Sequence, residues 1–257
     1  MISRKGRDMD FAGRTALITG AASGIGAATT AWLAEHGAAR LVLVDRNEAG
    51  LTGLQLPCNV VRFIGDVADP ALWERIEAEA GALDHAVLNA GIAAGAPIVD
   101  TAFDDWRRVL AINLDGAFLS LRTALRLLND GGSAVLTASV AGLKAEPNTG
   151  AYAVSKAAVI QLTKVAAREA ATRKIRVNAI APGAVDTPIW DGLAFFEDLV
   201  SQGGSRASAL EAMAQIATPL RRYARAQEIA GQIGFLLSDM AQNMTGTVLV
   251  SDGGFTL

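Results

Sequence analysis

Short apolar runs alternate with longer segments of helical periodicity along the whole chain. The short runs are rich in Val, Leu, Ile and Ala and lie at 15–20, 41–45, 60–65, 85–90, 133–139, 176–181 and 247–251. Because these runs are nearly continuous rather than interrupted by polar residues, they are typical of strands buried on both faces of a parallel sheet. The segments between them predict helices at 24–36, 70–80, 104–128, 151–173 and 226–238. We therefore predict an α/β fold with a doubly wound (Rossmann-type) seven-stranded parallel sheet, flanked by helices on both faces.

No repeat, low-complexity tract or proline-rich linker divides this pattern, so we expect residues 1–257 to form one dinucleotide-binding domain. Residues 187–223, which we call the lid segment, depart from the alternation. They contain Trp190, Phe195 and Phe196, and a Gly-Gly pair at 203–204. An insertion of this length with aromatic residues and a glycine hinge predicts a mobile substrate lid over a pocket, although an ordinary surface helix-loop-helix remains the alternative.

Composition excludes several classes of function. Of the 257 residues, 51% are hydrophobic and the net charge is only −3, which excludes a disordered chain and makes nucleic acid an unexpected partner. Charged residues form 19% of the chain, and so low a fraction favours an oligomer. The single cysteine, Cys58, excludes an internal disulfide. We expect no metal site, because the two histidines, His36 and His85, are too few and too scattered.

The ends of the chain and its longest apolar runs bear on its location. The basic start lacks the apolar core of a signal peptide, and no run approaches the roughly 18 apolar residues of a membrane span. We therefore expect a cytoplasmic protein without a membrane partner. Arg4, Lys5, Arg7 and Arg14 form either an interaction tail or a frayed terminus.

A glycine-rich turn follows the first predicted strand and opens a helix. Its residues are Gly20, Ser23, Gly24, Ile25 and Gly26. Glycine lets a strand turn sharply and lets backbone amides approach a pyrophosphate, to which the helix N-terminus adds partial positive charge. Because any tight strand-to-helix turn uses glycine, this pattern becomes specific only with its context.

Asp45 supplies that context at the end of the second predicted strand. A carboxylate there can accept hydrogen bonds from both ribose hydroxyls of an adenosine, and it repels a 2′-phosphate. We therefore expect NAD as cofactor, with NADP less favoured. Arg46 and Arg40 are the contrary indication, because either guanidinium can reach toward a 2′-phosphate.

Polar and small residues end the next two predicted strands. Asp66 and Val67 follow the third strand, where an aspartate can meet an adenine amino group, and Asn89, Ala90 and Gly91 end the fourth. The carboxyl edge of a sheet is where open α/β folds bind ligands. These residues are candidate cofactor contacts.

Tyr152 and Lys156 lie one turn apart in a predicted long helix, so they share a face. A tyrosine hydroxyl, with its usual pKa of about 10, exchanges protons poorly at neutral pH. An ammonium about 4 Å away, at an effective dielectric of about 20, favours the phenolate by roughly 4 kcal/mol, which lowers the pKa by about 3. The pair therefore predicts a general acid-base.

Two further polar residues complete the candidate catalytic set. Ser139 ends the fifth predicted strand, where its hydroxyl can hold a substrate oxygen against Tyr152. Asn113 interrupts an apolar helical run in which asparagine is unfavourable. It is either a kink or surface residue, or an amide that holds a water against Lys156 and extends a proton path.

These motifs, in this order over nearly the whole chain, resemble the short-chain dehydrogenase/reductase family in its branch of about 250 residues. The resemblance implies that Tyr152 is the acid-base, that Lys156 lowers its pKa and binds the nicotinamide ribose, and that Ser139 orients the substrate. It also implies that Asn113 completes a proton relay. The motif Pro182-Gly183 with Val185 and Thr187 resembles the residues that contact the nicotinamide carboxamide.

The implied reaction is reversible oxidation of a secondary alcohol to a ketone with NAD, without a metal. The candidate pocket residues by position are Ala141, Glu146, Asn148, Gly183, Trp190, Leu193 and Phe196. Aromatic residues in the lid segment favour an apolar or cyclic alcohol. Glu146 and Asn148 can instead read the hydroxyls of a sugar or polyol, and a non-catalytic NAD-binding sensor is a further alternative. The resemblance implies a homotetramer or homodimer formed through the helices at 104–128 and 151–173.

Overall fold

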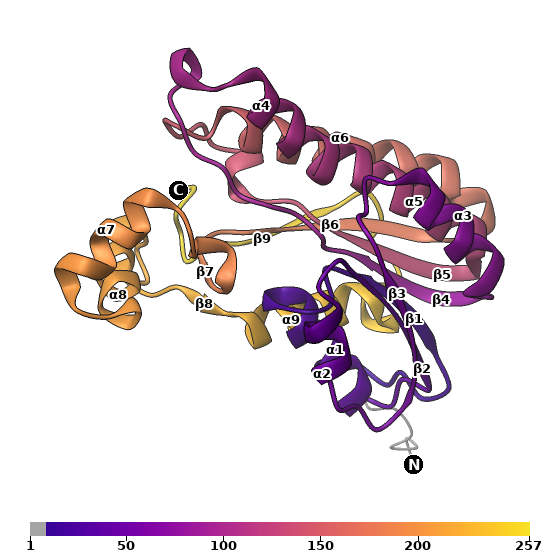
Figure 1. The fold of residues 1–257 in the computed structure, drawn as a ribbon. Coiled ribbons are helices and arrows are strands. Elements are labelled where there is room, and N and C mark those ends of the chain that lie inside the picture. The colour runs from indigo at the N-terminus through magenta and orange to yellow at the C-terminus, as the bar shows by residue number, and fades with distance from the viewer. Residues whose placement is uncertain (1–8) are drawn as a thin grey trace.

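The computed structural model describes residues 9–257, so Arg4, Lys5 and Arg7 lie outside the described residues. Its main sheet has seven parallel strands in the order β3-β2-β1-β4-β5-β6-β9 (Figure 1). The strands of this sheet are β1 (Thr15–Thr19), β2 (Arg40–Asp45), β3 (Asn59–Ile64), β4 (Leu83–Leu88), β5 (Leu128–Thr137), β6 (Arg176–Pro182) and β9 (Val248–Ser251). This confirms the predicted doubly wound sheet. Most strand ends fall within two residues of the prediction, whereas β5 begins earlier than expected, near a shift in its register with β4.

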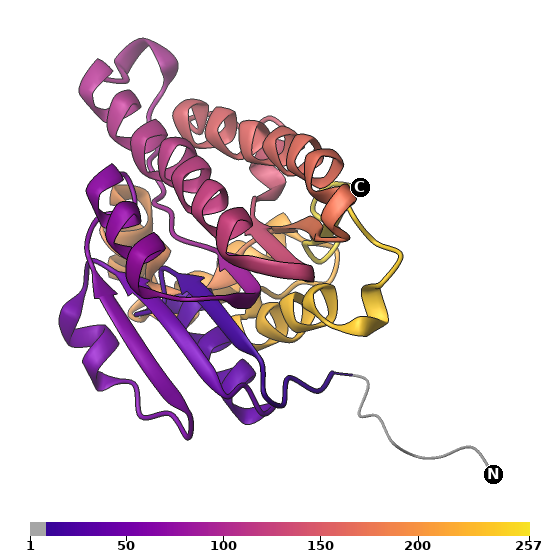
Figure 2. The same cartoon turned by 90° about the vertical axis from the view of Figure 1, so that its right-hand side faces the viewer.

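Helices cover both faces of the sheet. They are α1 (Gly24–Glu35), α2 (Glu48–Gly53), α3 (Pro70–Glu79), α4 (Phe103–Leu110), α5 (Gly116–Leu127), α6 (Gly150–Ala170), α7 (Ala194–Gly203), α8 (Arg206–Ala217) and α9 (Ala226–Leu237). Figure 1 shows α3, α5 and α6 over one face and α1, α2 and α9 under the other, and Figure 2 shows the same layering from the side. The short helix α2 was not predicted from the sequence.

Alternate side chains of the central strands enter two separate cores. On β1, Leu17 packs beneath the layer of α3, α5 and α6, whereas Ala16 and Ile18 pack beneath α1 and α9. Val42 and Leu43 on β2 divide in the same way, and all five side chains are almost fully buried. Burial on both faces explains why these strands read as continuous apolar runs.

The prediction of one helix over 104–128 is wrong in its middle. The chain forms α4, then a π-helical turn at Ala111–Asp115, then α5. Asn113 lies in this turn and is almost completely buried. Its amide makes two hydrogen bonds with the Ile92 backbone and one with the Ser155 hydroxyl. A π-turn inserts an extra residue into a helix and is common at functional sites, and here it directs Asn113 inward.

The lid segment lies beyond the carboxyl ends of the strands and contains α7 and α8 (Figure 1). Its two ends are joined by a second, two-stranded parallel sheet of β7 (Val185–Asp186) and β8 (Ala224–Arg225). Phe196, Ala209 and Leu210 form a small separate core between its helices. The lid segment is therefore anchored at its base and has its own packing.

Over the described range 9–257, no helix has both the length and the apolar character that crossing a membrane requires.

The contact between α1 and α9 gives a test of the packing. A Cβ at Gly234 would lie 2.3 Å from two ring atoms of Trp32. Trp32 cannot easily move, because it stacks on His36 at 3.6 Å and meets the edge of Phe11 at 5.7 Å. We expect Gly234→Ala to lower the free energy of unfolding by about 1–3 kcal/mol, despite the better helix propensity of alanine.

Urea denaturation measures this change. Gly53→Ala is the matched control, because a Cβ at Gly53, the last residue of α2, meets nothing within 4 Å. Equal stabilities of the two variants would contradict the packing argument.

Candidate active site

The glycine-rich turn and the Asn89-Ala90-Gly91 segment lie side by side, because β1 and β4 are neighbours at the point where the strand order reverses. The Thr19 hydroxyl oxygen accepts hydrogen bonds from the backbone amides of Asn89 (2.9 Å) and Ala90 (3.0 Å). These bonds fasten the ends of the two strands together. A crevice at such a reversal is the general ligand site of open α/β sheets.

Glycine is required at two positions of this turn. Gly20 has a φ of +66°, a backbone conformation that side-chain-bearing residues rarely adopt. At Gly26 a Cβ would lie 1.9 Å from the carbonyl oxygen of Gly20, so the first turn of α1 packs directly on the loop. Ser23, the N-cap of α1, is exposed and makes no capping hydrogen bond through its side chain. The loop thus presents free backbone amides and a hydroxyl.

Asp45 ends β2 beside this loop. One of its carboxylate oxygens accepts a hydrogen bond from the Ala22 amide at 3.0 Å, and the other accepts from the Asn47 amide at 2.9 Å. The carboxylate is partly exposed, and Arg46 next to it is exposed. The structure thus brings the predicted adenosine-reading carboxylate to the glycine turn.

Asp66 and Val67 end β3 farther along the same edge. Asp66 is exposed and its carboxylate accepts a hydrogen bond from the Ala68 amide at 2.9 Å. The Val67 side chain is buried in the core against Gly116. Only its backbone remains for a contact with a cofactor.

Lys156 is buried, with an exposed fraction of 4%, and it reaches β5. Its ammonium donates a hydrogen bond to the carbonyl oxygen of Thr137 at 2.8 Å. The Thr137 hydroxyl in turn donates to the Asn89 side chain at 3.2 Å. A Cβ at Gly91 would lie 3.3 Å from Nζ of Lys156 and 3.2 Å from Oδ1 of Asn113, so these three residues meet.

Tyr152 lies in the first turn of α6, and its hydroxyl is near the side chain of Ser139. The Lys156 ammonium lies 5.7 Å from the centre of the Tyr152 ring. Burial raises the pKa of Tyr152, and a hydrogen bond with the Ser139 side chain partly opposes this rise. The expected fall of the Tyr152 pKa is therefore not produced by the protein groups alone. The ammonium makes its hydrogen bond with Thr137, and burial lowers the pKa of Lys156 itself to about 8.

The segment after β6 approaches the glycine turn from the other side. Gly183 donates its amide to the Ser251 carbonyl at 2.9 Å, and Val185 is buried at the start of β7. Thr187 is also buried, and a Cβ at Gly24 would lie 3.3 Å from its Cβ. The residues from Pro182 to Thr187 are thus brought close to the predicted cofactor loop.

Arg206 of α8 holds the first part of the lid segment in place. Its guanidinium pairs with Asp186, contacts Asp191 at 3.2 Å and donates to the Thr187 carbonyl at 2.8 Å. It also lies 5.8 Å from the centre of the Phe196 ring. The hydrogen bonds that Arg206 donates to these two carboxylates raise the pKa of Arg206, so it stays charged.

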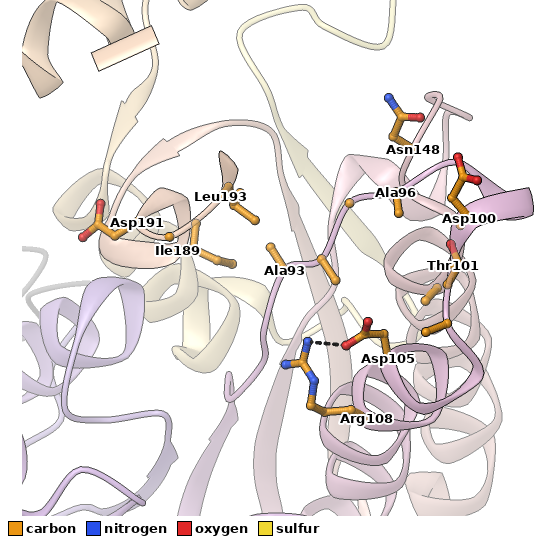
Figure 3. A pocket seen from close by; sticks show the side chains of 16 residues that line it. Ala93, Ala96, Asp100, Thr101, Asp105, Arg108, Asn148, Ile189, Asp191 and Leu193 are labelled. Carbon is orange, nitrogen blue, oxygen red and sulfur yellow. Dashed lines mark hydrogen bonds and ion pairs between the residues drawn. The ribbon is translucent and has the colours of Figure 1, made fainter. Parts of the chain in front are cut away.

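A cavity of about 410 Å³ lies between the segment after β4, the start of α4 and the lid segment (Figure 3). Small and branched apolar residues form much of its wall: Ala93, Ala94, Ala96, Ala102, Ala151, Ile189 and Leu193. Asp100, Thr101, Asp105, Arg108, Asn148 and Asp191 add polar groups. In Figure 3 the Arg108 guanidinium points to Asp105, at 3.1 Å. The cavity therefore combines an apolar wall with polar groups, and it borders the residue before Tyr152.

The comparisons with known proteins agree over nearly the full length. A family model described as Enoyl-(Acyl carrier protein) reductase matches residues 20–256. Cis-4-hydroxycyclohexanecarboxylate dehydrogenase of Sinomonas cyclohexanicum is 38% identical over 96% of this chain and 98% of its own. The solved structure of a short-chain type dehydrogenase/reductase from Mycobacterium marinum has 31% identity and a TM-score of 0.83, covering 97% of this chain and 98% of that one.

The chain belongs to the short-chain dehydrogenase/reductase family. L-sorbose reductase from Gluconobacter frateurii, solved with NADPH and L-sorbose, is also similar, with 30% identity, a TM-score of 0.87 and coverage of 96% and 98%. As a short-chain dehydrogenase/reductase, the protein is an oxidoreductase of hydroxyl or keto groups.

The predicted substrate residues of this dehydrogenase/reductase fall into two groups. Asn148 and Leu193 line the cavity. The other side chains lie elsewhere: Trp190 stacks on Tyr223 and Phe196 is buried within the lid segment, while Ala141 and Glu146 follow Ser139 outside the cavity wall.

Sequence reasoning missed several residues around the site. The small residues at 93–96 follow the Asn89-Ala90-Gly91 segment after Ile92, and a run of small residues after a strand end is a signal for a cavity wall. Asp105 and Arg108 carry no such signal, because only the tertiary fold brings α4 to the lid segment. Thr137 acts through its backbone carbonyl, which any residue type would provide.

Within residues 9–257, no cluster of three His, Cys, Asp or Glu side chains is arranged to hold a metal ion. His85 lies away from the candidate site. Its Nδ1 meets the Ser133 hydroxyl at 2.9 Å, and burial lowers the pKa of His85 to about 4.

The pKa of Lys156 predicts a dependence of stability on pH. Burial lowers this pKa from 10.5 to about 8, so between pH 8 and 10 the unfolded chain binds more protons at this site than the folded protein. The free energy of unfolding contributed by Lys156 therefore rises with pH across this window, by about 2–3 kcal/mol.

Urea denaturation from pH 8 to 10 measures this slope. Lys156→Met should remove the rise, whereas Lys164→Met, at an exposed position on α6, should keep it. Comparing the variants cancels contributions common to all, such as that of Cys58, whose pKa is raised by burial. Equal slopes of the free energy of unfolding against pH for Lys156→Met and Lys164→Met would show that Lys156 does not cause the rise.

Proposed function

We propose that the protein oxidises a secondary alcohol to a ketone, reversibly, with NAD as cofactor and an apolar or cyclic alcohol as substrate. The observation that carries this proposal is the meeting of Lys156 and Asn113 beside Gly91, at the reversal of strand order. The Lys156 ammonium lies 5.7 Å from the centre of the Tyr152 ring, and Tyr152 is hydrogen-bonded with Ser139. Acid-base, orienting and proton-conducting groups are thereby concentrated at a dinucleotide crevice.

The glycine turn fits a dinucleotide. Gly26 lets α1 begin directly against the Gly20 carbonyl. The Ser23 side chain makes no capping bond, and the first turn of α1 carries no acidic residue to repel a pyrophosphate. Gly20, Gly24, Gly26 and Ile25 would hold the pyrophosphate, and Asp45 the adenosine ribose. When bound, the nicotinamide supplies the hydride acceptor.

The chain's own residues then handle the substrate and its proton. Ser139 holds the hydroxyl oxygen against Tyr152, and the Tyr152 phenolate accepts the proton from that hydroxyl. The positive charge of Lys156 favours the phenolate, and its hydrogen bond with Thr137 fixes that charge in place. Asn113, whose amide is fixed by Ile92 and Ser155, extends the path for the proton.

Two observations bear on the substrate. The alanines with Ile189 and Leu193 favour a compact apolar or cyclic alcohol, and a ring-bearing hydroxy acid is named for the Sinomonas relative. Asp100, Asp105 and Asn148 favour the alternative, a sugar or polyol, as does the L-sorbose bound to the Gluconobacter structure. A screen of cyclic alcohols against polyols, each with NAD and with NADP, separates the two.

The arrangement of the molecule completes the proposal. One dinucleotide-binding domain carries the lid segment, whose base is fixed by β7 and β8 and whose approach to Thr187 is set by Arg206. A homotetramer or homodimer is supported by apolar side chains exposed on the two long helices, namely Phe118 on α5 and Val154 and Val165 on α6. A cytoplasmic location stays a prediction.

Replacing Tyr152 by phenylalanine tests the chemistry. Tyr152→Phe keeps the ring and removes the hydroxyl that transfers the proton, so turnover should fall by at least about 10²-fold. The dissociation constant of NADH, measured by nicotinamide fluorescence, should change little. Unchanged turnover would exclude Tyr152 as the acid-base, and a wild-type protein that binds NADH without oxidising any alcohol would support the sensor alternative.

Replacing Asp45 tests the choice of cofactor. The Asp45 carboxylate would repel a 2′-phosphate, so Asp45→Asn should improve the affinity for NADPH relative to NADH by at least about tenfold. Asparagine has the same shape and can still accept from the Ala22 amide, so the loop should persist. Arg46→Gln tests the contrary possibility that the Arg46 guanidinium binds a 2′-phosphate. Because NADH has no 2′-phosphate, this variant should leave the NADH affinity unchanged. A wild-type preference for NADPH that Arg46→Gln abolishes would assign NADP instead.

A further inference from the structure

The connection from Ser139 to α6, residues 140–149, contains a lysine that none of the steps above uses. Lys144 extends from this connection, which we call the serine loop, to Phe255. Its ammonium donates to the Phe255 carbonyl at 2.8 Å and lies 4.3 Å from the centre of the Phe255 ring. One charged group therefore makes both a hydrogen bond and a cation–π contact with the same residue.

Lys144 is close in the chain to both catalytic side chains. The amides of Lys144 and Leu143 each donate to the Val140 carbonyl at 2.8 Å, which makes a tight turn directly after Ser139. On the other side, the Lys144 ammonium lies 3.7 Å from Glu146, and the Glu146 carbonyl accepts from the hydroxyl of Thr149, the N-cap of α6. A displacement of Lys144 is thus transmitted to Ser139 and to the helix of Tyr152.

The partner of Lys144 lies in a turn that is itself rigid. Asp252 accepts hydrogen bonds from the Gly254 amide (2.9 Å), the Thr256 amide (2.8 Å) and the Thr256 hydroxyl (2.7 Å). These bonds close residues 252–257 into one unit around Phe255. We call this unit the 252–257 turn.

The 252–257 turn also contacts the end of the lid segment. The Gly253 carbonyl accepts from the Leu220 amide at 3.1 Å. A Cβ at Gly254 would lie 2.8 Å from Pro219, and a Cβ at Gly183 would lie 2.8 Å from Cα of Asp252. The turn is therefore packed between the lid segment and the segment that follows β6.

We infer that Lys144 is a positioning residue: through Phe255 it couples the serine loop to the 252–257 turn and thereby to the lid segment, and so fixes Ser139 relative to the lid. The consequence for substrate binding rests on the proposed function, whereas the coupling itself does not. Lys144 touches neither substrate nor cofactor in this assignment.

Hydrogen–deuterium exchange read by mass spectrometry tests the coupling without reference to activity. Lys144→Met removes the ammonium and keeps the stem, so exchange should accelerate both in peptides of 139–150 and in peptides of 216–224. Lys144→Arg keeps a donor and a cation and should restore the wild-type exchange. Lys164→Met, at an exposed lysine of α6, is the control and should change neither region.

A double-mutant cycle tests whether Phe255 is the route. Phe255→Leu removes the ring and leaves the carbonyl, so it should have a smaller effect than Lys144→Met. In the Lys144→Met background it should add nothing. Fully additive effects of the two changes, or faster exchange in the serine loop alone, would overturn the inference.

Steady-state kinetics with the alcohol found in the screen gives the functional readout. Lys144→Met should raise KM for the alcohol about fivefold, which corresponds to the loss of one hydrogen bond or cation–π contact. The dissociation constant of NADH should stay within about twofold of the wild-type value. An unchanged KM together with unchanged exchange would reject the inference. If the wild-type protein oxidises no alcohol but the exchange pattern is as expected, the proposed function fails and the coupling stands.

Discussion

The ammonium of Lys156 is buried beneath α6, and a buried charge must find a partner. Its partner is the Thr137 carbonyl at the end of β5, at 2.8 Å. The Thr137 hydroxyl reaches Asn89 at the end of β4, and the Asn89 amide reaches Thr19 at the end of β1. The hydrogen bonds that begin at this one charge therefore connect the carboxyl ends of three strands with the helix of Tyr152. A buried polar network of this kind is costly unless its members are paired, so these hydrogen bonds and the packing of the strands depend on one another.

The proposed site has a cofactor half and a substrate half, and the two differ in physical origin. The cofactor half is formed by strand ends and a glycine turn, which the sheet holds rigidly. The substrate half is formed by segments between elements: residues 93–96, the serine loop and the lid segment. These segments are held by a few polar anchors, such as Arg206 on Asp186 and Asp191, rather than by a shared core. Substrate preference can therefore change with little effect on the sheet.

Much of the fold follows from the sequence, because its elements obey strong local rules. Strands buried on both faces show as apolar runs, and the spacing of Tyr152 and Lys156 fixes their common face on any helix. The π-turn at Asn113 has no such signal, since the same residues would also form an ordinary helix. The direction in which the pKa of Tyr152 shifts depends on its burial and on which group accepts the hydrogen bond from Lys156. Neither can be read from the spacing of the two residues. Likewise, Arg108 enters the cavity only through the placement of α4 beside the lid segment.

The π-turn at 111–115 takes up one residue more than an α-helical turn, so α5 continues from α4 with its faces in place. Deleting one position from 111–115 would turn this stretch into an ordinary α-helix and would leave the residues after it on the same faces. The stripe that includes Leu121 and Ala124 now faces the sheet, whereas Phe118 is exposed on the outer surface. A single deletion in the turn would therefore leave both faces in place and remove only the irregular turn that directs Asn113 inward. The position of the Asn113 amide could therefore be lost or gained by one inserted residue, while the packing of α5 on the sheet stays the same.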